Sequence, residues 1–231
     1  MKKGLKKILA VILTLSVLLC TGISLTTANA YYIEYGENDT LEIFGRYYCA
    51  PGESIPFDVC YPDVEFDYYY PVVLDYNIGD AVYDDEGECI GFEGYQNGVT
   101  LINVVFCDED GSIVADQFNL FIVSDGEDMG ELTYATAYNI DANYKEEGYI
   151  SLYLDYETEE TPYYCVLVDD LDSPIYLENE YYYADSVGSG SAIVYIIDAQ
   201  GNVFASAIDV DVNYSIIQWI IRIIFFGWLW Y

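Results

Sequence analysis

The side chains of this sequence that could do chemistry are tyrosines and carboxylates. The 231 residues include 27 tyrosines and 40 acidic residues, and runs of tyrosine occur at 68–70, 163–164 and 181–183. Exposed tyrosine rings can stack on sugar faces while neighbouring carboxylates accept hydrogen bonds from the sugar hydroxyl groups. Alternate residues of a strand share a face. The predicted ligand face therefore comprises Tyr68, Tyr70, Tyr163, Tyr181 and Tyr183.

Two interpretations of this tyrosine pattern stay open. Carbohydrate binding, with or without the help of Ca²⁺, would use the outward rings and the acids beside them. Alternatively, tyrosine serves as a strand former, with inward rings that fill a core and outward rings that cover a sheet. The structural interpretation is favoured, and apart from Ca²⁺ no cofactor is expected.

The composition argues against enzymatic activity. Histidine is absent from the chain, which excludes serine–histidine and cysteine–histidine catalysis and histidine-ligated metal sites. With 40 acidic residues, no pair of carboxylates stands out for sugar hydrolysis. The segment Asp108–Gly111 lacks the third oxygen ligand and the later Glu of a calcium-binding loop. We therefore expect a non-catalytic protein.

The element that must position these side chains is a β-hairpin that occurs twice. Each copy has a turn with Asp first and Gly fourth, Asp108–Gly111 and Asp198–Gly201, between β-branched and aromatic residues. The Asp carboxylate can accept hydrogen bonds from turn amides, and Gly adopts positive φ without steric cost. The two turns lie 198 − 108 = 90 residues apart, a domain-sized interval. The sequence therefore predicts two tandem β domains.

Short strands separated by turns fill the rest of both halves, and among them strands are expected over Ser54–Cys60, Leu132–Ile140 and Tyr149–Tyr156. No segment between Tyr31 and Tyr214 has helical periodicity over a useful length, and Pro71 indicates an edge strand or a bulge. The small, acidic segment Ser124–Gly130 has the composition of a linker. We expect an all-β fold with sandwich domains at residues 31–126 and 127–214.

This pattern resembles the bacterial immunoglobulin-like and fibronectin-type repeats of exported surface proteins. The resemblance covers about Leu41 to Asn213 and depends on the strand count and on the Asp-x-x-Gly hairpins with their flanking Val, Ile and Phe residues. It implies two tandem immunoglobulin-like β-sandwiches.

The cysteines allow several arrangements. The bridge of an immunoglobulin-like sandwich would here join Cys60 to Cys107. The alternation of apolar residues predicts that Ile55, Phe57 and Val59 point inward, and likewise Ile102, Val104 and Phe106, which places both cysteine side chains outside. A bridge between Cys49 and Cys60, across the turn at Pro51-Gly52, is an equal alternative. Cys165 is the best candidate for an unpaired thiol, and all the cysteines after the leader could remain reduced.

Residues 1–30 have the pattern of a secretory leader, expected to be helical. Four lysines precede the apolar stretch Ile8–Leu19, and Ala28-Asn29-Ala30 is a small-x-small cleavage site. Four of the seven basic residues and no acidic residue lie in this segment, so the mature chain keeps three basic and 40 acidic residues, a net charge of −37. Such a charge argues against nucleic acid as a partner.

Residues 215–231 change abruptly to apolar and aromatic composition. A helix from Ile216 onward would be about 24 Å long, shorter than a bilayer core of ~30 Å, and Arg222 lies in its middle. Trp and Tyr favour the membrane–water boundary, so we expect a short, partly inserted anchor; the alternative is an extra strand or helix packed on the protein. The predicted envelope contacts are Trp219, Phe225, Phe226, Trp228, Trp230 and Tyr231.

This tail is similar to the Trp/Phe/Gly-containing C-terminal tails of some exported multi-repeat proteins of Gram-positive bacteria, which implies surface retention. It lacks a Leu-Pro-x-Thr-Gly motif. Together these features predict an exported extracellular or cell-surface protein that acts as a structural or adhesive spacer or protein-contact module. A secreted carbohydrate-binding module is the alternative.

Overall fold

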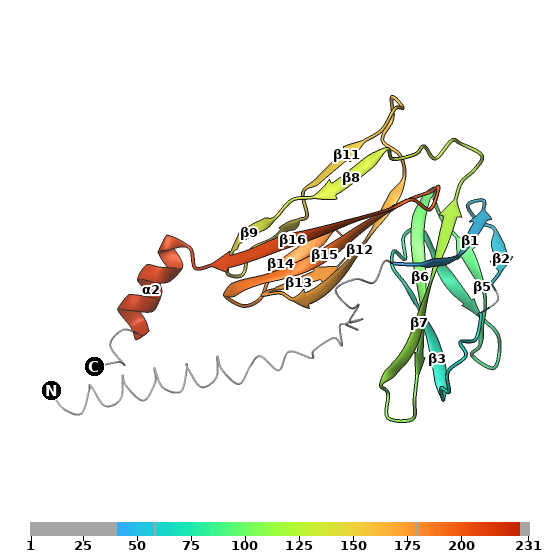
Figure 1. Ribbon diagram of the computed structural model, residues 1–231, viewed down its shortest axis with the longest axis horizontal. Coiled ribbons are helices and arrows are strands. Elements are labelled where there is room, and N and C mark those ends of the chain that lie inside the picture. Colours follow the sequence, from blue (N-terminus) through green and yellow to red (C-terminus); the bar gives the residue numbers. More distant parts are fainter. Residues whose placement is uncertain (1–40, 58, 179, 227–231) are drawn as a thin grey trace, which may run out of the picture. The chain divides into compact units, whose positions relative to one another are not determined.

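The computed structural model describes residues 41–226, except residues 58 and 179. Within them the chain forms β-strands and one helix, α2 (Ile216–Phe226), as Figure 1 shows. The expectation of a predominantly β fold is confirmed. The leader predicted at residues 1–30 lies outside the described residues.

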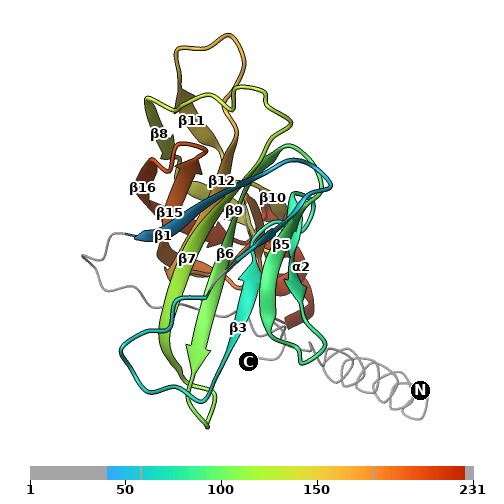
Figure 2. The same ribbon diagram turned by 90° about the vertical axis from the view of Figure 1, so that its right-hand side faces the viewer.

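The strands up to residue 123, called the first sandwich below, form two sheets around one buried core. One sheet has the order β1-β7-β6-β3, with β1 parallel to β7, and the other has the order β2-β5-β4. In Figure 2, β7, β6 and β3 lie side by side. This division of strands 2, 4 and 5 from strands 3, 6 and 7 is that of an immunoglobulin-like sandwich. The bounds are β1 (Ile43–Cys49), β2 (Ser54–Pro56), β3 (Tyr68–Val73), β4 (Gly79–Tyr83), β5 (Cys89–Gly94), β6 (Gly98–Cys107) and β7 (Ile113–Val123).

Inward apolar side chains from both sheets make this core. Ile102, Val104 and Phe106 on β6 are at most 1% exposed, as their alternation predicted. Phe92 on β5 and Phe121 on β7 meet across the core with ring centroids 4.3 Å apart. Full burial of a Phe side chain stabilises a fold by about 1.5–3 kcal/mol. These contacts between the sheets therefore hold the first sandwich together.

The strands from residue 134 to 213, called the second sandwich, repeat the plan. One sheet has the order β12-β15-β16-β9, with β9 parallel to β16, and the opposite strands pair as β10-β14-β13 and β11-β8. Val194, Ile196 and Val210 are completely buried in the core of this sandwich. The bounds are β8 (Tyr134–Ala137), β9 (Ile140–Asn143), β10 (Glu147–Tyr149), β11 (Leu152–Asp155), β12 (Tyr164–Asp172), β13 (Ile175–Glu178), β14 (Tyr181–Ala184), β15 (Gly188–Asp198) and β16 (Val203–Asn213).

The predicted division into two domains stays a prediction. The contacts among the described residues gather both sandwiches into one compact unit. Each sandwich nevertheless has its own buried cluster of apolar side chains.

Both repeated turns have the predicted geometry. The amides of Gly111 and Gly201 donate to the carbonyls of Asp108 and Asp198 at 3.1 and 3.0 Å. The φ angles of the two glycines are 89° and 81°. The Asp198 carboxylate accepts a hydrogen bond from the Asn202 amide at 2.9 Å, and the Asp108 carboxylate accepts the corresponding bond in its own turn. The interpretation as plain hairpin turns is therefore confirmed.

Three expected strands are shorter or divided. The strand expected over Ser54–Cys60 is shorter and ends at Pro56, although the Phe57 amide still donates to the Ile90 carbonyl of β5 at 3.2 Å. The strand expected over Leu132–Ile140 is divided into β8 and β9. The strand expected over Tyr149–Tyr156 is divided because the chain changes partner, from β14 along β10 to β8 along β11.

The cysteines correct two further expectations. Cys49, Cys60, Cys89, Cys107 and Cys165 are all free thiols, so neither candidate bridge is present. Cys60 is exposed, as the alternation predicted. Cys107 was expected outside but is 1% exposed, because β6 is buried on both faces along its whole length.

Candidate functional site

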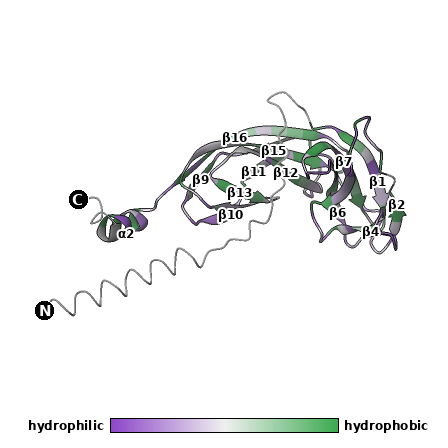
Figure 3. Ribbon diagram, turned by 90° about the horizontal axis from the view of Figure 1, so that it is seen from below, coloured by the Kyte–Doolittle hydropathy of each residue, from purple (hydrophilic) through white to green (hydrophobic). Residues whose placement is uncertain are grey.

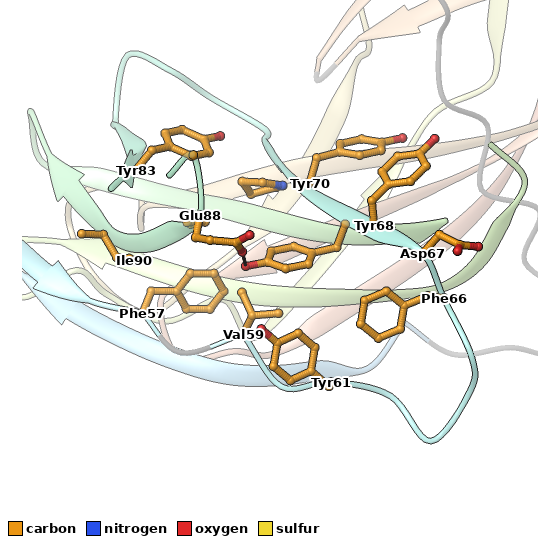
Figure 4. A pocket seen from close by; sticks show the side chains of 14 residues that line it. Phe57, Val59, Tyr61, Phe66, Asp67, Tyr68, Tyr70, Tyr83, Glu88 and Ile90 are labelled. Carbon is orange, nitrogen blue, oxygen red and sulfur yellow. Dashed lines mark hydrogen bonds between the residues drawn. The ribbon is translucent and has the colours of Figure 1, made fainter. Parts of the chain in front are cut away.

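An aromatic cleft lies in the first sandwich, where β3 and the β4–β5 turn meet the segment that follows β2 (Figure 4). Its volume is about 730 Å³, within the range of ligand-binding clefts. Phe57, Val59 and Tyr61, which follow β2 in the chain, belong to one wall. The cleft is lined by Phe57, Val59, Tyr61, Phe66, Asp67, Tyr68, Tyr69, Tyr70, Pro71, Tyr83, Gly87, Glu88, Cys89 and Ile90.

The Tyr69 hydroxyl and the Glu88 carboxylate form the polar centre of this cleft. The hydroxyl donates to Glu88 Oε2 at 2.6 Å, the dashed bond in Figure 4. Glu88 is exposed and closes the β4–β5 turn, where its amide donates to the Asp84 carboxylate at 2.9 Å. The turn therefore fixes the backbone of Glu88, and Tyr69 fixes its side chain.

Stacked rings make the wall beside this pair. The Tyr61 and Phe66 rings lie 5.8 Å apart and nearly parallel, at 8°. Tyr61 also meets Tyr69 edge-on at 5.9 Å, and Phe66 meets the buried Phe106 at 5.0 Å. The wall is thus attached to the core through aromatic contacts, which contribute about 0.5–1.5 kcal/mol each beyond the area that they bury.

The environment of Tyr69 keeps its hydroxyl protonated. Burial raises the pKa of Tyr69, and the hydrogen bond to Glu88 and the nearby Tyr61 raise that pKa further. At neutral pH the hydroxyl therefore remains a donor, and Glu88 accepts from it.

The predicted ligand residues Tyr68 and Tyr70 are brought together at the rim of the cleft. Their ring centroids lie 6.4 Å apart, with 26° between the ring planes. In Figure 4 both rings point away from Glu88. The ring of Tyr69, between them in the sequence, packs against the core on the other face of β3. The expectation that Tyr68 and Tyr70 share a face is confirmed.

The other three predicted ligand residues have separate surroundings in the second sandwich. Tyr163 is 36% exposed and precedes β12. The Tyr181 hydroxyl donates to the Glu147 carboxylate at 2.6 Å. Tyr183 lies under the Lys145 ammonium, 5.0 Å from its ring centroid. A ligand-binding role for these three residues stays a prediction.

Sequence reasoning missed the side chains that make the interior of the cleft. The predicted ligand face left out Tyr69, the middle member of its run, and Glu88 was not singled out. Pro56 and Pro62 were the sequence signal for this wall, because two prolines so close together favour an irregular segment outside a sheet. No sequence pattern places the β4–β5 turn opposite that wall.

A second candidate site is the apolar helix α2, whose first turn is firmly attached. Ser215 caps the helix: its hydroxyl accepts from the Gln218 amide at 3.3 Å, and its own amide donates to Gln218 Oε1 at 2.8 Å. This reciprocal pair is a capping box. Gln218 Nε2 also donates to the Tyr144 carbonyl at 2.7 Å. The start of α2 is therefore joined to the second sandwich.

Aromatic and cationic side chains strengthen this junction. The Tyr214 ring meets Tyr144 at 5.5 Å and Trp219 at 5.6 Å, both edge-on. The Arg222 guanidinium lies 4.7 Å from the Tyr214 ring centroid, and the Lys145 ammonium lies 4.9 Å from that of Tyr144. Such cation–π contacts contribute about 0.5–1 kcal/mol at exposed sites.

From its first residue onward, α2 exposes apolar side chains around its circumference. The exposed fractions run from 49% to 79% for Ile216, Ile217, Trp219, Ile220, Ile221 and Ile223. Figure 3 shows hydrophobic residues along this helix, interrupted by hydrophilic ones. Phe225 and Phe226 belong to α2 by backbone, whereas the other predicted contacts, Trp228, Trp230 and Tyr231, lie outside the described residues.

Two further features concern membrane spanning and metal binding. None of the helices between residues 41 and 226 is long and apolar enough to cross a bilayer. In the same part of the chain, no group of three metal-ligating side chains is placed to hold an ion.

No family model and no curated protein matches the chain. Among solved structures, the D00–D0 domain of intimin is 11% identical, with a TM-score of 0.28, over 74% of this chain and 96% of that one. The fibronectin(III)-like modules of Clostridium thermocellum CbhA are 13% identical, with a TM-score of 0.25, over 76% and 93%.

Chicken VE-cadherin EC1-2 is 9% identical, with a TM-score of 0.27, over 74% of this chain and 99% of that one. Since TM-scores this low do not establish a common fold, the immunoglobulin-like assignment depends on the strand order and pairing described above.

Proposed function

We propose that this protein is a non-catalytic, exported contact module that attaches to a membrane surface of the cell envelope through α2. The observation that carries the proposal is the exposure of the helix. Six large apolar side chains of α2 are 49–79% exposed, while capping and ring contacts hold its first turn on the second sandwich.

The exposed area requires a cover. Soluble monomers rarely expose contiguous apolar patches larger than a few hundred Å². The eleven residues of α2 span about 16 Å, about half of a bilayer core of ~30 Å. A helix of this length fits the interfacial region, where Trp219 would be at the favoured depth for its ring.

The charge distribution supports the direction of attachment. The chain has 40 acidic and seven basic residues. Two of the basic residues lie over the rings at the junction between the second sandwich and α2: Lys145 over Tyr144, and Arg222, from the middle of the helix, over Tyr214. A bilayer would therefore meet cations and apolar side chains first, while the acidic sandwiches remain in water. Export through the predicted leader at residues 1–30 belongs to the same proposal.

The test is flotation of the chain without the predicted leader, residues 31–231, with phosphatidylcholine vesicles, because the apolar leader at residues 1–30 could itself bind a bilayer. The double variant Ile220→Glu and Ile223→Glu should lower the bound fraction at least tenfold, because it replaces two apolar side chains with charges at the interface. The control Val187→Glu changes a 41% exposed residue outside the helix and should bind as the unchanged chain does. Equal flotation of all three proteins would refute attachment through α2.

A second candidate function, carbohydrate binding, is favoured by the Tyr68–Tyr70 pair. Two nearly parallel rings 6.4 Å apart, of which Tyr68 is 45% exposed, offer a platform on which a sugar could stack. Binding to a glycan array that is lost in Tyr68→Ala would support this candidate. An array without signal, with and without Ca²⁺, would exclude it.

A further inference from the structure

We propose that the aromatic cleft of the first sandwich binds a basic side chain, lysine or arginine, presented by a partner polypeptide. The inference rests on the proposed contact role and names the chemistry of the contact. It concerns the interior of the cleft, where Tyr61, Phe66, Tyr69 and Glu88 meet, and not the outer rings of Tyr68 and Tyr70.

The cleft combines aromatic rings with a carboxylate, which together suit a cation. Cations are attracted to the faces of tyrosine and phenylalanine rings, and the stacked pair Tyr61–Phe66 forms a wall of the cleft. Glu88 stands opposite this wall, as Figure 4 shows. A basic side chain that enters the cleft can therefore contact ring faces and end at a carboxylate.

The Glu88 carboxylate can accept further hydrogen bonds besides the one from Tyr69. Its Oε2 accepts from Tyr69, but a carboxylate has two oxygens and about four acceptor positions. Because Tyr69 holds the side chain in place, little conformational entropy is lost when a further donor binds. Hydrogen bonds between an ammonium or guanidinium group and a carboxylate are roughly twice as strong as those between neutral groups.

Within the described part of the chain, no basic side chain competes with a partner for this cleft. The cleft lining contains Asp67 and Glu88 but no lysine or arginine. The basic residues of the described segments have partners elsewhere: Arg46 donates to the Ala199 carbonyl, Lys145 pairs with Asp185, and Arg222 lies over the Tyr214 ring. A partner must therefore supply the positive charge.

The size of the cleft favours a peptide over a single small cation. A volume of about 730 Å³ exceeds what one ammonium group fills and has room for a basic side chain with its neighbouring backbone. The acidic surface of the chain, with a net charge of −33, also accelerates the approach of a basic partner.

The test uses the full chain in a zwitterionic detergent and a fluorescent, end-blocked tetra-arginine peptide, followed by fluorescence anisotropy. The neutral probe is the matching tetra-citrulline peptide, which keeps the shape of arginine without its charge. We expect tetra-arginine to bind at least tenfold more tightly than tetra-citrulline. Glu88→Gln should weaken tetra-arginine binding about tenfold, because the amide keeps the bond from Tyr69 but loses the charge.

The matched control is Glu86→Gln, two residues away in the same turn, exposed and outside the cleft lining. It should change the affinity less than twofold. Equal losses in Glu86→Gln and Glu88→Gln would mean unspecific charge attraction and would overturn the proposal. So would equal binding of the two peptides, or binding of cellotetraose that Glu88→Gln abolishes.

This experiment separates the inference from the proposed function. Neither Glu88→Gln nor Glu86→Gln touches α2, so vesicle flotation of both variants reports on attachment alone. If the protein floats with vesicles but does not prefer tetra-arginine, the cleft proposal is refuted and attachment through α2 is supported. If it prefers tetra-arginine but does not float, attachment through α2 is refuted and the cleft proposal is supported.

Discussion

The buried carboxylate of Asp198 provides the sharpest test of how the repeated hairpin supports the fold. This residue is completely buried and accepts four hydrogen bonds. Three come from its own turn: the amides of Gln200 and Asn202 and the side-chain amide of Asn202, each at 2.9 Å. The fourth comes from the buried amide of Leu132, at 3.1 Å.

Asp198→Ala should lower the free energy of unfolding by about 3 kcal/mol. Loss of the acceptor leaves the Leu132 amide buried and unsatisfied, which costs about 1–3 kcal/mol, and each lost charge-assisted bond in the turn adds to that. Relief from burying a charged group offsets part of the sum.

The equivalent residue Asp108 is the matched control, because its side chain accepts from the Ser112 amide at the tip of an exposed hairpin. Asp108→Ala should cost about 1 kcal/mol. Urea unfolding followed by far-ultraviolet circular dichroism measures both. Equal losses for the two variants would refute the argument that Asp198 stabilises the second sandwich through Leu132.

Three further predictions follow from single groups. Burial, followed by the charge of Glu180 and the hydrogen bond with it, raises the pKa of Tyr164 to about 12. The stability that this shift contributes is complete below pH ~10 and disappears as the pH rises through 12. The variant Tyr164→Phe should therefore lose less stability in that pH window, as unfolding at fixed pH values would measure. Ser215→Ala removes half of the capping box and should destabilise α2 by about 1 kcal/mol, seen as faster hydrogen exchange in the helix but not in β16. Among the five cysteines from Cys49 onward, maleimide should label Cys60 in the native protein, and the four buried thiols should react after unfolding. Peptide mapping by mass spectrometry measures the labelling. If all five cysteines of the native protein reacted at equal rates, the burial of the four would be contradicted.

Local residue types were sufficient to predict most of the fold. The Asp-x-x-Gly turns predicted both hairpins because Asp and Gly satisfy the turn by themselves, without help from distant residues. The alternation along β6 identified Ile102, Val104 and Phe106 as inward residues. It failed for Cys107, because alternation assumes one solvent-exposed face and β6 is covered on both.

The candidate site depends on long-range contacts, and the sequence revealed it in part. The tyrosine run was recognised, and the shared face of Tyr68 and Tyr70 was correct. The interior pair of Tyr69 and Glu88 was not recognised, because their 2.6 Å hydrogen bond joins residues 19 positions apart. The two residues come together because the sheet that contains β3 packs against the sheet that contains β4 and β5, and a local sequence pattern does not predict that packing.

The most direct test of the central claim, that α2 attaches the protein to a membrane, is tryptophan fluorescence. All three tryptophans of the chain lie at or after Trp219, so their emission reports on the C-terminal segment alone. On addition of phosphatidylcholine vesicles to the chain without the predicted leader, residues 31–231, we predict a shift of the emission to shorter wavelength and strong quenching by brominated lipid. Unchanged emission with no quenching would contradict the account.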